Sequence, residues 1–302
     1  MPDSSAAGPS GPVSSSAAPA DESRVVRAAR RRETETPPPP EPLPVPVLDS
    51  HTHLDIVGGD PVASIAAAAS VGVTRLVQVG CDVPSSRWGV ALAEAQPAVL
   101  ATVALHPNEA PRLGADLDEA LRVIEDLAGR PRVRGIGETG LDTFRTGDDG
   151  RAAQERSFRA HIAVAKQYAK PLVIHDRDAH ADILRVLDEE GAPETVVMHC
   201  FSGDDAFATE CVKRGFVLSF AGTVTFKNAH NLRAAALVTP LDQMLVETDS
   251  PYLTPMPHRG RPNNSFLIPL TVRFLAATIG RDLDEVCAGI SATGERVFGP
   301  WA

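Results

Sequence analysis

Short apolar runs that alternate with helical segments constrain the fold of this chain more than any other feature. Each run ends abruptly in polar residues, and apolar residues then recur at i, i+3, i+4 and i+7, the pattern of an amphipathic helix. Runs without polar alternation are typical of strands buried on both faces of a parallel sheet. The runs are Pro46–Asp49, Thr74–Gly80, Val99–Leu105, Val133–Gly137, Leu172–His175, Thr195–His199, Phe216–Phe220 and Met244–Glu247.

These eight units, within about 255 residues, predict an α/β protein with a (β/α)8 TIM barrel. An open, doubly wound sheet is the alternative fold. Residues Ser265–Gly299 read as helical and are expected to complete the outer ring of helices. Because no change of composition or internal repeat follows, we predict that residues 46–302 form one domain. The helical segments between the runs include Leu117–Leu127, Gln154–Ala169, Asp182–Glu190 and Ala206–Arg214.

The first 45 residues differ from the rest in composition. They are rich in Pro, Ser and Ala, include the run Pro37–Pro40, and contain few large apolar side chains. Such a segment buries too little surface to offset the entropy lost on ordering. We therefore predict that residues 1–45 form a disordered extension.

Charge and cysteine usage exclude several classes of protein. The chain carries 39 acidic and 29 basic residues, a formal net charge of −10, which argues against nucleic-acid binding through a broad basic surface. No apolar stretch reaches the roughly 18 residues that a membrane span needs. The four cysteines are far apart and form no C-x-x-C pair, so we expect reduced thiols and a cytoplasmic location.

Histidine and carboxylate side chains gather where the predicted strands end, which is the face that carries the active site in barrel enzymes. His51 and His53 are two residues apart on an extended segment, so both imidazoles project to the same side. Nitrogen and oxygen ligands without thiolate suit zinc, manganese, iron or magnesium. Six ligands exceed the needs of one tetrahedral ion, which favours two metal ions and a bridging carboxylate. The other four candidates are Glu138, His175, His199 and Asp249.

The strand ends resemble those of the TatD-type deoxyribonuclease family, metal-dependent hydrolases with amidohydrolase-like barrels. The matching stretches are Leu48–Asp55, Gly135–Asp142, His175–Arg177, His199–Gly203 and Glu247–Leu253, in family order and across the whole chain after the extension. The resemblance implies that His51, His53, Glu138 and Asp249 hold one divalent ion, and that Glu138, His175 and His199 hold the other.

The same resemblance implies hydrolysis of phosphodiester esters by a deoxyribonuclease, similar to a 3′-5′ exonuclease, acting on DNA or short nucleic acids. A metal-bound water would be the nucleophile, with Asp249 as its general base and Glu138 as the bridging ligand. The two ions are Mg²⁺, Mn²⁺ or Zn²⁺, a choice that the residues leave open.

Several polar residues are expected to contact substrate. Arg177 lies two positions past His175 and faces the same way, so it is the first candidate for a phosphate contact. His106, at the end of the third strand, either contacts substrate or packs in its loop. Lys227 matches a family stretch, and Arg259, Arg261 and Asn263 fit the family pattern Arg-Gly-x-x-Asn. The chain departs from the family at Asn264-Ser265, where acid-proline is common, and at Phe144, where tyrosine is common.

Three further features have two interpretations. Asp49 is in phase with His51 and His53, so it is either a ligand or a partner that orients a ligand histidine. Cys200 follows His199 directly and is expected to face the helix layer, because adjacent strand residues point to opposite sides. Gly135-x-Gly137-x-x-Gly140 matches a dinucleotide fingerprint, but no helix follows at once, so we expect no nucleotide cofactor.

Two other functions remain open from the sequence. One is hydrolysis of a small-molecule amide, lactone or ester by an amidohydrolase-like enzyme, because such barrels support many reactions. The other is a metal-binding accessory protein without enzymatic activity. We expect a monomer in either case.

Overall fold

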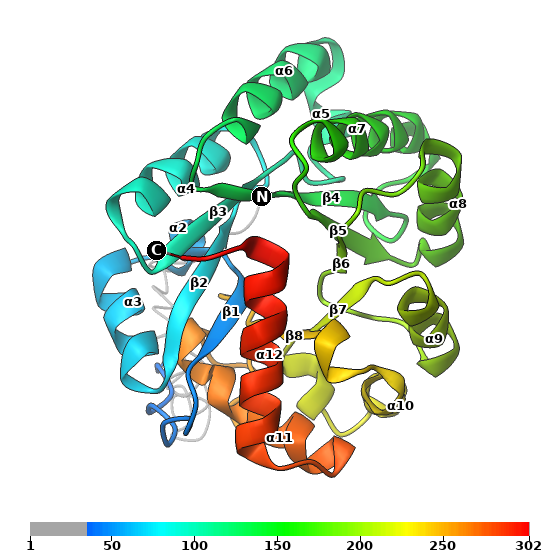
Figure 1. The fold of residues 1–302 in the computed structure, drawn as a ribbon. Coiled ribbons are helices and arrows are strands. Elements are labelled where there is room, and N and C mark those ends of the chain that lie inside the picture. The colour runs from blue at the N-terminus through cyan, green and yellow to red at the C-terminus, as the bar shows by residue number, and fades with distance from the viewer. Residues whose placement is uncertain (1–34, 302) are drawn as a thin grey trace, which may run out of the picture.

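The computed structural model describes residues 35–301, and its eight parallel strands form one sheet whose spatial order follows the chain from β1 to β8 (Figure 1). Helices surround this sheet, as expected where strands are buried on both faces. The strands are β1 (Val47–Thr52), β2 (Val73–Val79), β3 (Val99–Val103), β4 (Val133–Asp142), β5 (Leu172–Arg177), β6 (Val196–Met198), β7 (Val217–Phe220) and β8 (Met244–Val246).

The sheet closes between β1 and the segment that follows β8. Thr52 forms a parallel bridge with Ser250. The backbone N–H of Asp249 donates to the carbonyl of His51 at 2.9 Å, and that of His53 donates to the carbonyl of Ser250 at 3.0 Å. The structure therefore confirms the TIM barrel and not the open doubly wound sheet.

Helices follow the strands in the order expected for a barrel. Side-chain caps fix several of their starts: Asp82 and Ser85 form a capping box on α4, and the carboxylates of Asp60 and Asp204 cap α3 and α9. Within residues 35–301, no helix is long and apolar enough to cross a membrane. The helices are α2 (Leu54–Val57), α3 (Pro61–Ser70), α4 (Val83–Ala95), α5 (Ala110–Leu113), α6 (Leu117–Ala128), α7 (Asp148–Gln167), α8 (His180–Glu190), α9 (Asp205–Lys213), α10 (His230–Val238), α11 (Ile268–Ile279) and α12 (Leu283–Phe298).

Strand β4 is longer than its apolar run predicts. The run ends at Gly137, but pairing with β5 continues through Thr139, Leu141 and Asp142. Hydrogen bonds to β5 keep this stretch in the sheet. The glycines of the fingerprint-like stretch thus lie inside a strand, and the next helix, α7, begins only at Asp148.

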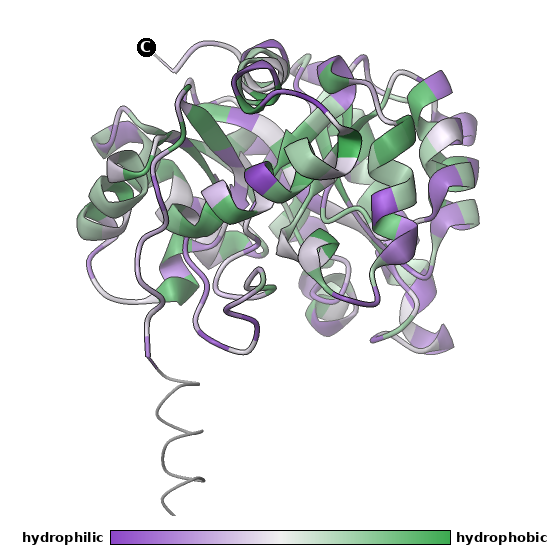
Figure 2. Cartoon of the chain, turned by 90° about the horizontal axis from the view of Figure 1, so that it is seen from below, coloured by the Kyte–Doolittle hydropathy of each residue, from purple (hydrophilic) through white to green (hydrophobic). Residues whose placement is uncertain are grey.

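Apolar residues of the strands and helices form one buried core. Figure 2 shows hydrophobic colour on the inner strands and frequent hydrophilic residues on the outer helices. Helix α12 packs especially closely on β1. A Cβ atom at Gly294 would lie 2.6 Å from Cδ1 of Leu48, so a larger residue there would force the Leu48 side chain to move. The predicted helical tail therefore covers the strands at the point of closure.

Residues 35–45, the last part of the predicted extension, lie against the barrel in the structure. Leu43 is buried, and its backbone N–H donates to the carbonyl of Val71 at 3.0 Å. Arg273 donates to the carbonyls of Glu41 and Pro42, both at 3.0 Å. This segment is ordered by hydrogen bonds from the barrel, which its own composition does not reveal. The remainder of the predicted extension, residues 1–34, lies outside the described residues.

Candidate metal centre

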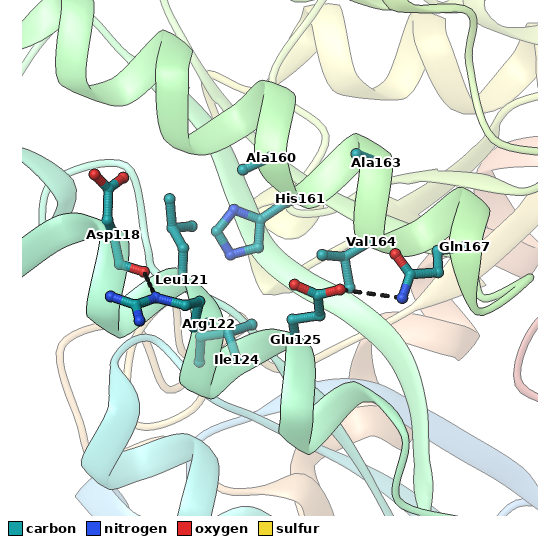
Figure 3. Close-up of a pocket in the computed structure, with 10 residues that line it drawn as sticks. All are labelled: Asp118, Leu121, Arg122, Ile124, Glu125, Ala160, His161, Ala163, Val164 and Gln167. Carbon is teal, nitrogen blue, oxygen red and sulfur yellow. Dashed lines mark hydrogen bonds between the residues drawn. The ribbon is translucent and has the colours of Figure 1, made fainter.

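Two cavities differ in position and chemistry. The smaller, of about 340 Å³, lies between α6 and α7 and is lined by helix side chains such as Leu121, Glu125 and His161 (Figure 3). The larger, of about 1250 Å³, opens at the carboxyl ends of the strands, where barrel enzymes carry their sites. Among the residues that line the larger cavity are His53, Glu138, His175, His199 and Asp249.

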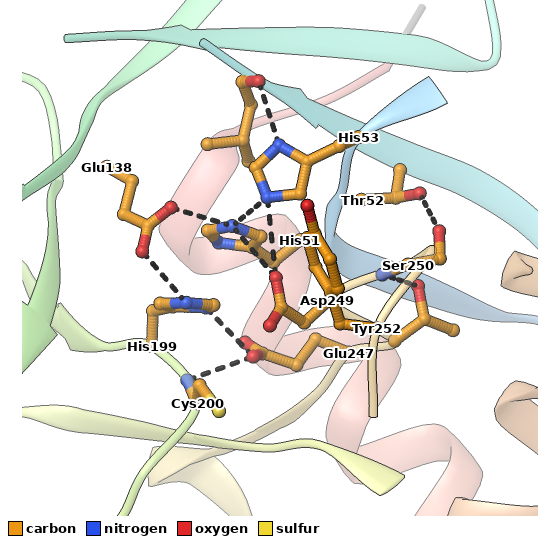
Figure 4. Close-up of polar contacts among 12 residues, drawn as sticks. His51, Thr52, His53, Glu138, His199, Cys200, Glu247, Asp249, Ser250 and Tyr252 are labelled. Atoms are coloured by element: carbon orange, nitrogen blue, oxygen red, sulfur yellow. Dashed lines mark hydrogen bonds and ion pairs between the residues drawn. The ribbon is translucent and has the colours of Figure 1, made fainter. Parts of the chain in front are cut away.

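One group of ligand atoms comes from β1 and the segment after β8. The Nε2 atoms of His51 and His53 lie 3.2 Å apart, and Oδ1 of Asp249 lies 3.3 Å from Nε2 of His53 and 3.9 Å from Nε2 of His51 (Figure 4). The backbone bonds that close the barrel bring Asp249 to the two histidines. Nδ1 of His53 lies 3.3 Å from the carbonyl of Val79, a contact that leaves Nε2 free for a ligand.

Glu138 of β4 lies between this group and a second one. Its Oε2 lies 3.5 Å from Nε2 of His51, whereas its Oε1 lies 2.6 Å from Nδ1 of His175 and 3.2 Å from Nε2 of His199. The two oxygens of one buried carboxylate thus face two different sets of nitrogen atoms. This is the arrangement that a bridging carboxylate requires.

A close approach of β4 and β5 makes this contact possible. Gly140 has a φ of 137°, in the region that favours glycine. A Cβ atom there would lie 2.1 Å from the carbonyl oxygen of His175. Gly140 therefore lets β5 come near enough for His175 to reach Glu138.

Two buried acidic residues, Asp49 and Glu247, form hydrogen bonds or close contacts with the candidate ligands or their neighbours in the chain. Asp49 accepts hydrogen bonds from the backbone N–H and the hydroxyl of Thr248, at 2.9 and 2.5 Å, so both of its oxygens are engaged. Of the two interpretations of Asp49, the structure favours a positioning residue over a ligand. Glu247 accepts from the backbone N–H of Cys200 at 2.9 Å, and the same oxygen lies 2.8 Å from Nδ1 of His199.

Burial and opposite charges shift the pKa values of these groups. Burial acts to raise the pKa of Glu138, but the nearby His199 and His106 hold it well below its ordinary value. Burial also acts to lower the pKa of His199, yet Glu247 and Glu138 raise it well above the usual range. Desolvation raises the pKa of Asp49 to about 7. The pKa of each of these groups therefore depends on the charges of its neighbours as well as on burial.

The residues predicted to contact substrate differ in their distance from the candidate ligands and in whether they line the cavity. His106 faces the centre, with Nε2 3.5 Å from Oε1 of Glu138. Arg177 lines the cavity, and its guanidinium lies 4.2 Å from the ring centre of Phe144. Arg259 is exposed and stacks on Phe226, which lines the cavity. Lys227 is exposed and does not line the cavity.

Arg261 and Asn263 contact the protein itself. Arg261 donates to the carbonyls of Glu35 and Thr36, at 2.9 and 3.3 Å. Asn263 is buried and donates to the carbonyls of Thr248 and Tyr252, at 2.9 and 2.5 Å. Both side chains therefore hold the loop after β8 and the N-terminal segment, and their contact with a substrate stays a prediction.

Sequence reasoning missed four residues that adjoin the ligands. Glu247 ends the last apolar run, which is the signal that could have singled it out. Asp142 follows Glu138 in the same strand, and its Oδ2 lies 3.4 Å from Nε2 of His175. The thiol of Cys81 lies 3.7 Å from Oε2 of Glu138. Cys200 lines the cavity because its φ of 43° breaks the alternation of an extended strand, contrary to the prediction that it faces the helices.

Comparison with known proteins identifies relatives that match most of this chain. The family described as TatD related DNase matches residues 48–299. A metal-dependent hydrolase of Mycobacterium tuberculosis named TatD is 46% identical over 260 residues, covering 83% of this chain and 97% of the relative. A Citrobacter rodentium protein named 3′-5′ ssDNA/RNA exonuclease TatD is 32% identical over 242 residues, covering 78% and 90%.

A solved structure is also similar to this chain in sequence and in fold. The crystal structure of a TatD homologue from Escherichia coli K12 superimposes with a TM-score of 0.79 and 27% sequence identity. The match covers 84% of this chain and 98% of that one. The similarity in sequence and in fold therefore extends over nearly the whole length of these relatives.

Proposed function

Because this chain belongs to the TatD family of metal-dependent hydrolases, which act on ester bonds, we propose that it cleaves phosphodiester bonds of DNA or short nucleic acids at a centre of two divalent ions. The observation that carries the proposal is the position of Glu138, whose two oxygens face separate groups of histidine nitrogens. Exonucleolytic action in the 3′-5′ direction is the mode suggested by the name of the Citrobacter relative.

The donor atoms fit divalent ions. Ligands about 2.1 Å from one ion lie roughly 3.0 to 3.5 Å from each other in octahedral or tetrahedral geometry. The separations of 3.2, 3.3 and 3.9 Å among His51, His53 and Asp249 fall at or near this range. On the other side of Glu138, its Oε1 lies 2.6 Å from Nδ1 of His175 and 3.2 Å from Nε2 of His199, and these nitrogens would be the ligands of the second ion. Imidazole and carboxylate are compatible with Zn²⁺ and Mn²⁺, and carboxylate with Mg²⁺.

Bound divalent ions would polarise the phosphoryl oxygens and lower the pKa of a water molecule. The residues of the chain complete the reaction. Asp249 takes the proton of the attacking water, since its carboxylate lies beside His53 and remains ionised: burial raises its pKa, but the contact with His53 lowers it overall. Arg177 and His106, at the side of the cavity, bind the phosphate oxygens.

The size of the cavity favours a polymeric substrate. Pockets for small molecules and cofactors commonly measure about 300 to 1,000 Å³. At about 1250 Å³, the cavity at the strand ends exceeds that range and leaves room on both sides of the ligand atoms. A strand that extends beyond the cleaved bond would fill this space.

End-labelled single-stranded DNA tests the proposal, with metal-stripped protein to which Mg²⁺, Mn²⁺ or Zn²⁺ is added back. We expect a ladder that shortens from the 3′ end only when metal is present. Glu138→Ala should abolish it, and Asp249→Asn should reduce kcat by about 10² to 10⁴, the usual contribution of a general base. Cleavage of a cyclic amide or lactone, with no phosphodiester cleaved under any ion, would instead support a small-molecule hydrolase.

A further inference from the structure

A cluster of positive side chains lies at the amino ends of the strands, whereas the candidate metal centre lies at their carboxyl ends. Arg134 is the second residue of β4, Arg132 precedes that strand, and Lys170 precedes β5. Nη1 of Arg132 donates to the carbonyl of Trp301 at 2.7 Å. Nη1 of Arg134 would lie 3.3 Å from a Cβ atom at Gly299. Both arginines therefore contact the segment that follows α12.

These three cations have no acidic partner within the part of the chain that the structure describes. The neighbouring Arg130, by contrast, pairs with Glu94. Burial and the charge of Arg134 lower the pKa of Lys170 to about 8, and they also lower the pKa of Arg132. Three positive charges thus repel one another where contact with water is reduced, an arrangement that is unfavourable without an anion.

Arg134 is the member of the cluster whose donors are unused. Arg132 uses four N–H groups on backbone carbonyls, and Lys170 donates to two others. Among residues 35–301, the guanidinium of Arg134 has no acceptor, although its Nε is shielded from solvent, and the buried indole N–H of Trp301 has none either. A buried donor without an acceptor is unfavourable, and a guanidinium can bind an oxyanion through two parallel N–H bonds.

We propose that the amino end of the barrel carries a binding site for a phosphate dianion, held by the guanidinium of Arg134 with Lys170 and Arg132 beside it. A dianion offsets more of the three positive charges than a monovalent ion does, and its oxygens match the fork of a guanidinium. Arg134 and Glu138 are four residues apart in β4, roughly 13 Å along an extended strand. The site is therefore separate from the metal centre and does not depend on the proposed hydrolysis.

Binding of radiolabelled inorganic phosphate to the full chain in Mg²⁺, measured by equilibrium dialysis, tests the site. Glu138→Ala alters the metal centre and should still bind one phosphate per chain, with a Kd on the order of 1 mM. Adding Arg134→Met should weaken this binding about ten-fold or more, because the guanidinium supplies the main contacts. Adding Lys170→Met should weaken it about three-fold. Arg281→Met, which removes an exposed ion pair with Glu285, is the control and should leave it unchanged.

Thermal unfolding gives a readout that a structural arginine would not give. Without phosphate, Arg134→Met should melt at or above the temperature of wild type, because the variant relieves repulsion from Lys170 and Arg132. Phosphate at about ten times Kd should raise the Tm of Glu138→Ala by about 2 to 3 °C. The same addition should have no such effect once Arg134→Met is present.

A mononucleotide distinguishes two sources of the dianion. The compound 5′-dAMP carries the same group on a larger body, and Glu138→Ala is used so that binding at the metal centre does not interfere. Equal Kd values for 5′-dAMP and phosphate would identify a terminal phosphate as the ligand, and weaker binding of 5′-dAMP would identify the free ion. Both results support the site.

Several results would overturn this site. They are no phosphate bound by Glu138→Ala at about twenty times the expected Kd, undiminished binding in Arg134→Met, and an Arg134→Met variant that fails to fold or melts well below wild type. The last would show that Arg134 has a partner within the protein. Phosphate binding that appears only when Gly-Ser-Gly is added after Ala302, which lies outside the described residues, would show that a carboxylate at Ala302 occupies the cluster.

Discussion

Glu247 is buried away from solvent, and its carboxylate determines the orientation of the His199 imidazole. Its Oε1 lies 2.8 Å from Nδ1 of His199 and accepts the backbone N–H of Cys200. A carboxylate in this position orients the imidazole so that Nε2 faces Glu138, and it increases the basicity of the ring. Glu247 is therefore a positioning residue for one of the proposed metal ligands.

Replacing this carboxylate should weaken metal binding without removing a ligand. For Glu247→Gln, we expect affinity for Zn²⁺ or Mn²⁺ to fall about 10- to 100-fold, as measured by competition with a chelating dye. Glu295→Gln, in an exposed ion pair with Arg75, is the matched control and should bind metal as wild type does. Unchanged affinity in Glu247→Gln would show that His199 needs no such partner.

At the residue scale, spacing in the sequence identified the residues on the strands better than those on the loops. Five of the six candidate ligands line one cavity, and the sixth, His51, lies beside His53 with their Nε2 atoms 3.2 Å apart. They come together because parallel strands bring them to the same side of the barrel. Arg261 and Asn263 are different, since hydrogen bonds from a loop to backbone carbonyls depend on a loop path that no periodicity describes. Cys200 was misplaced because its left-handed φ is not encoded by an alternating pattern.

At the scale of elements, His161 joins helix α7 to the segment after β3. It is buried, its Nε2 accepts the backbone N–H of Leu105 at 3.0 Å, and its Nδ1–H donates to the carbonyl of Ser157 at 2.6 Å. Both contacts require the neutral imidazole, because a protonated ring has no acceptor for Leu105. Burial accordingly lowers the pKa of His161 from 6.5 to about 4.

This lowered pKa makes stability depend on pH. Above pH 6.5 the imidazole is neutral in both the folded and the unfolded chain, so its titration does not reduce the free energy of unfolding. As the pH falls from 6.5 towards 4, the unfolded chain takes up the proton first and is favoured. From pH 7.5 to pH 5, we expect this group to remove about 2 kcal/mol from the free energy of unfolding.

Urea unfolding of wild type and His161→Gln at both pH values measures this contribution. The variant should lose about 2 kcal/mol less than wild type over the interval, whatever its stability at pH 7.5. His230→Gln, at an exposed position on α10, should follow wild type. Parallel pH dependence in wild type and His161→Gln would contradict a neutral, buried His161.

Apolar runs located the strands, but they did not fix where each strand ends. β4 continues five residues past its apolar run, since pairing with β5 also holds Thr139 and Asp142. Periodicity located α7 by its apolar stripe and missed its first turns, where polar residues from Asp148 onward precede that stripe. Main-chain hydrogen bonding between neighbouring elements, which a single sequence does not display, sets these boundaries.

At the scale of the whole molecule, residues 35–45 connect the start of the barrel to the loop after β8. Leu43 packs beside Gly72, Arg273 holds the middle of the segment, and Arg261 holds Glu35 and Thr36. The same loop contains Asn263, whose amide bonds to Thr248 near the metal centre. The segment is thus part of the folded domain, although its proline-rich composition predicts disorder.

Shortening the buried side chain of Leu43, which packs this segment against the barrel, should destabilise the protein. For Leu43→Ala, 6% exposed in wild type, we expect a loss of about 2 kcal/mol, at the low end for buried leucines because the site is peripheral. The melting temperature should fall by about 5 °C. Val62→Ala, at a 48% exposed position, is the control and should change little. An unchanged Tm in Leu43→Ala would mean that the segment contributes nothing to stability.

The central claim is that one bridging carboxylate assembles a centre of two ions that cleaves phosphodiesters. Metal-stripped protein titrated with Mn²⁺, while hydrolysis of single-stranded DNA and bound metal are measured together, tests it most directly. We expect activity to rise to a plateau at two ions per chain, and Glu138→Ala to bind fewer ions and remain inactive. A plateau at one ion per chain, or full activity in Glu138→Ala, would contradict the account.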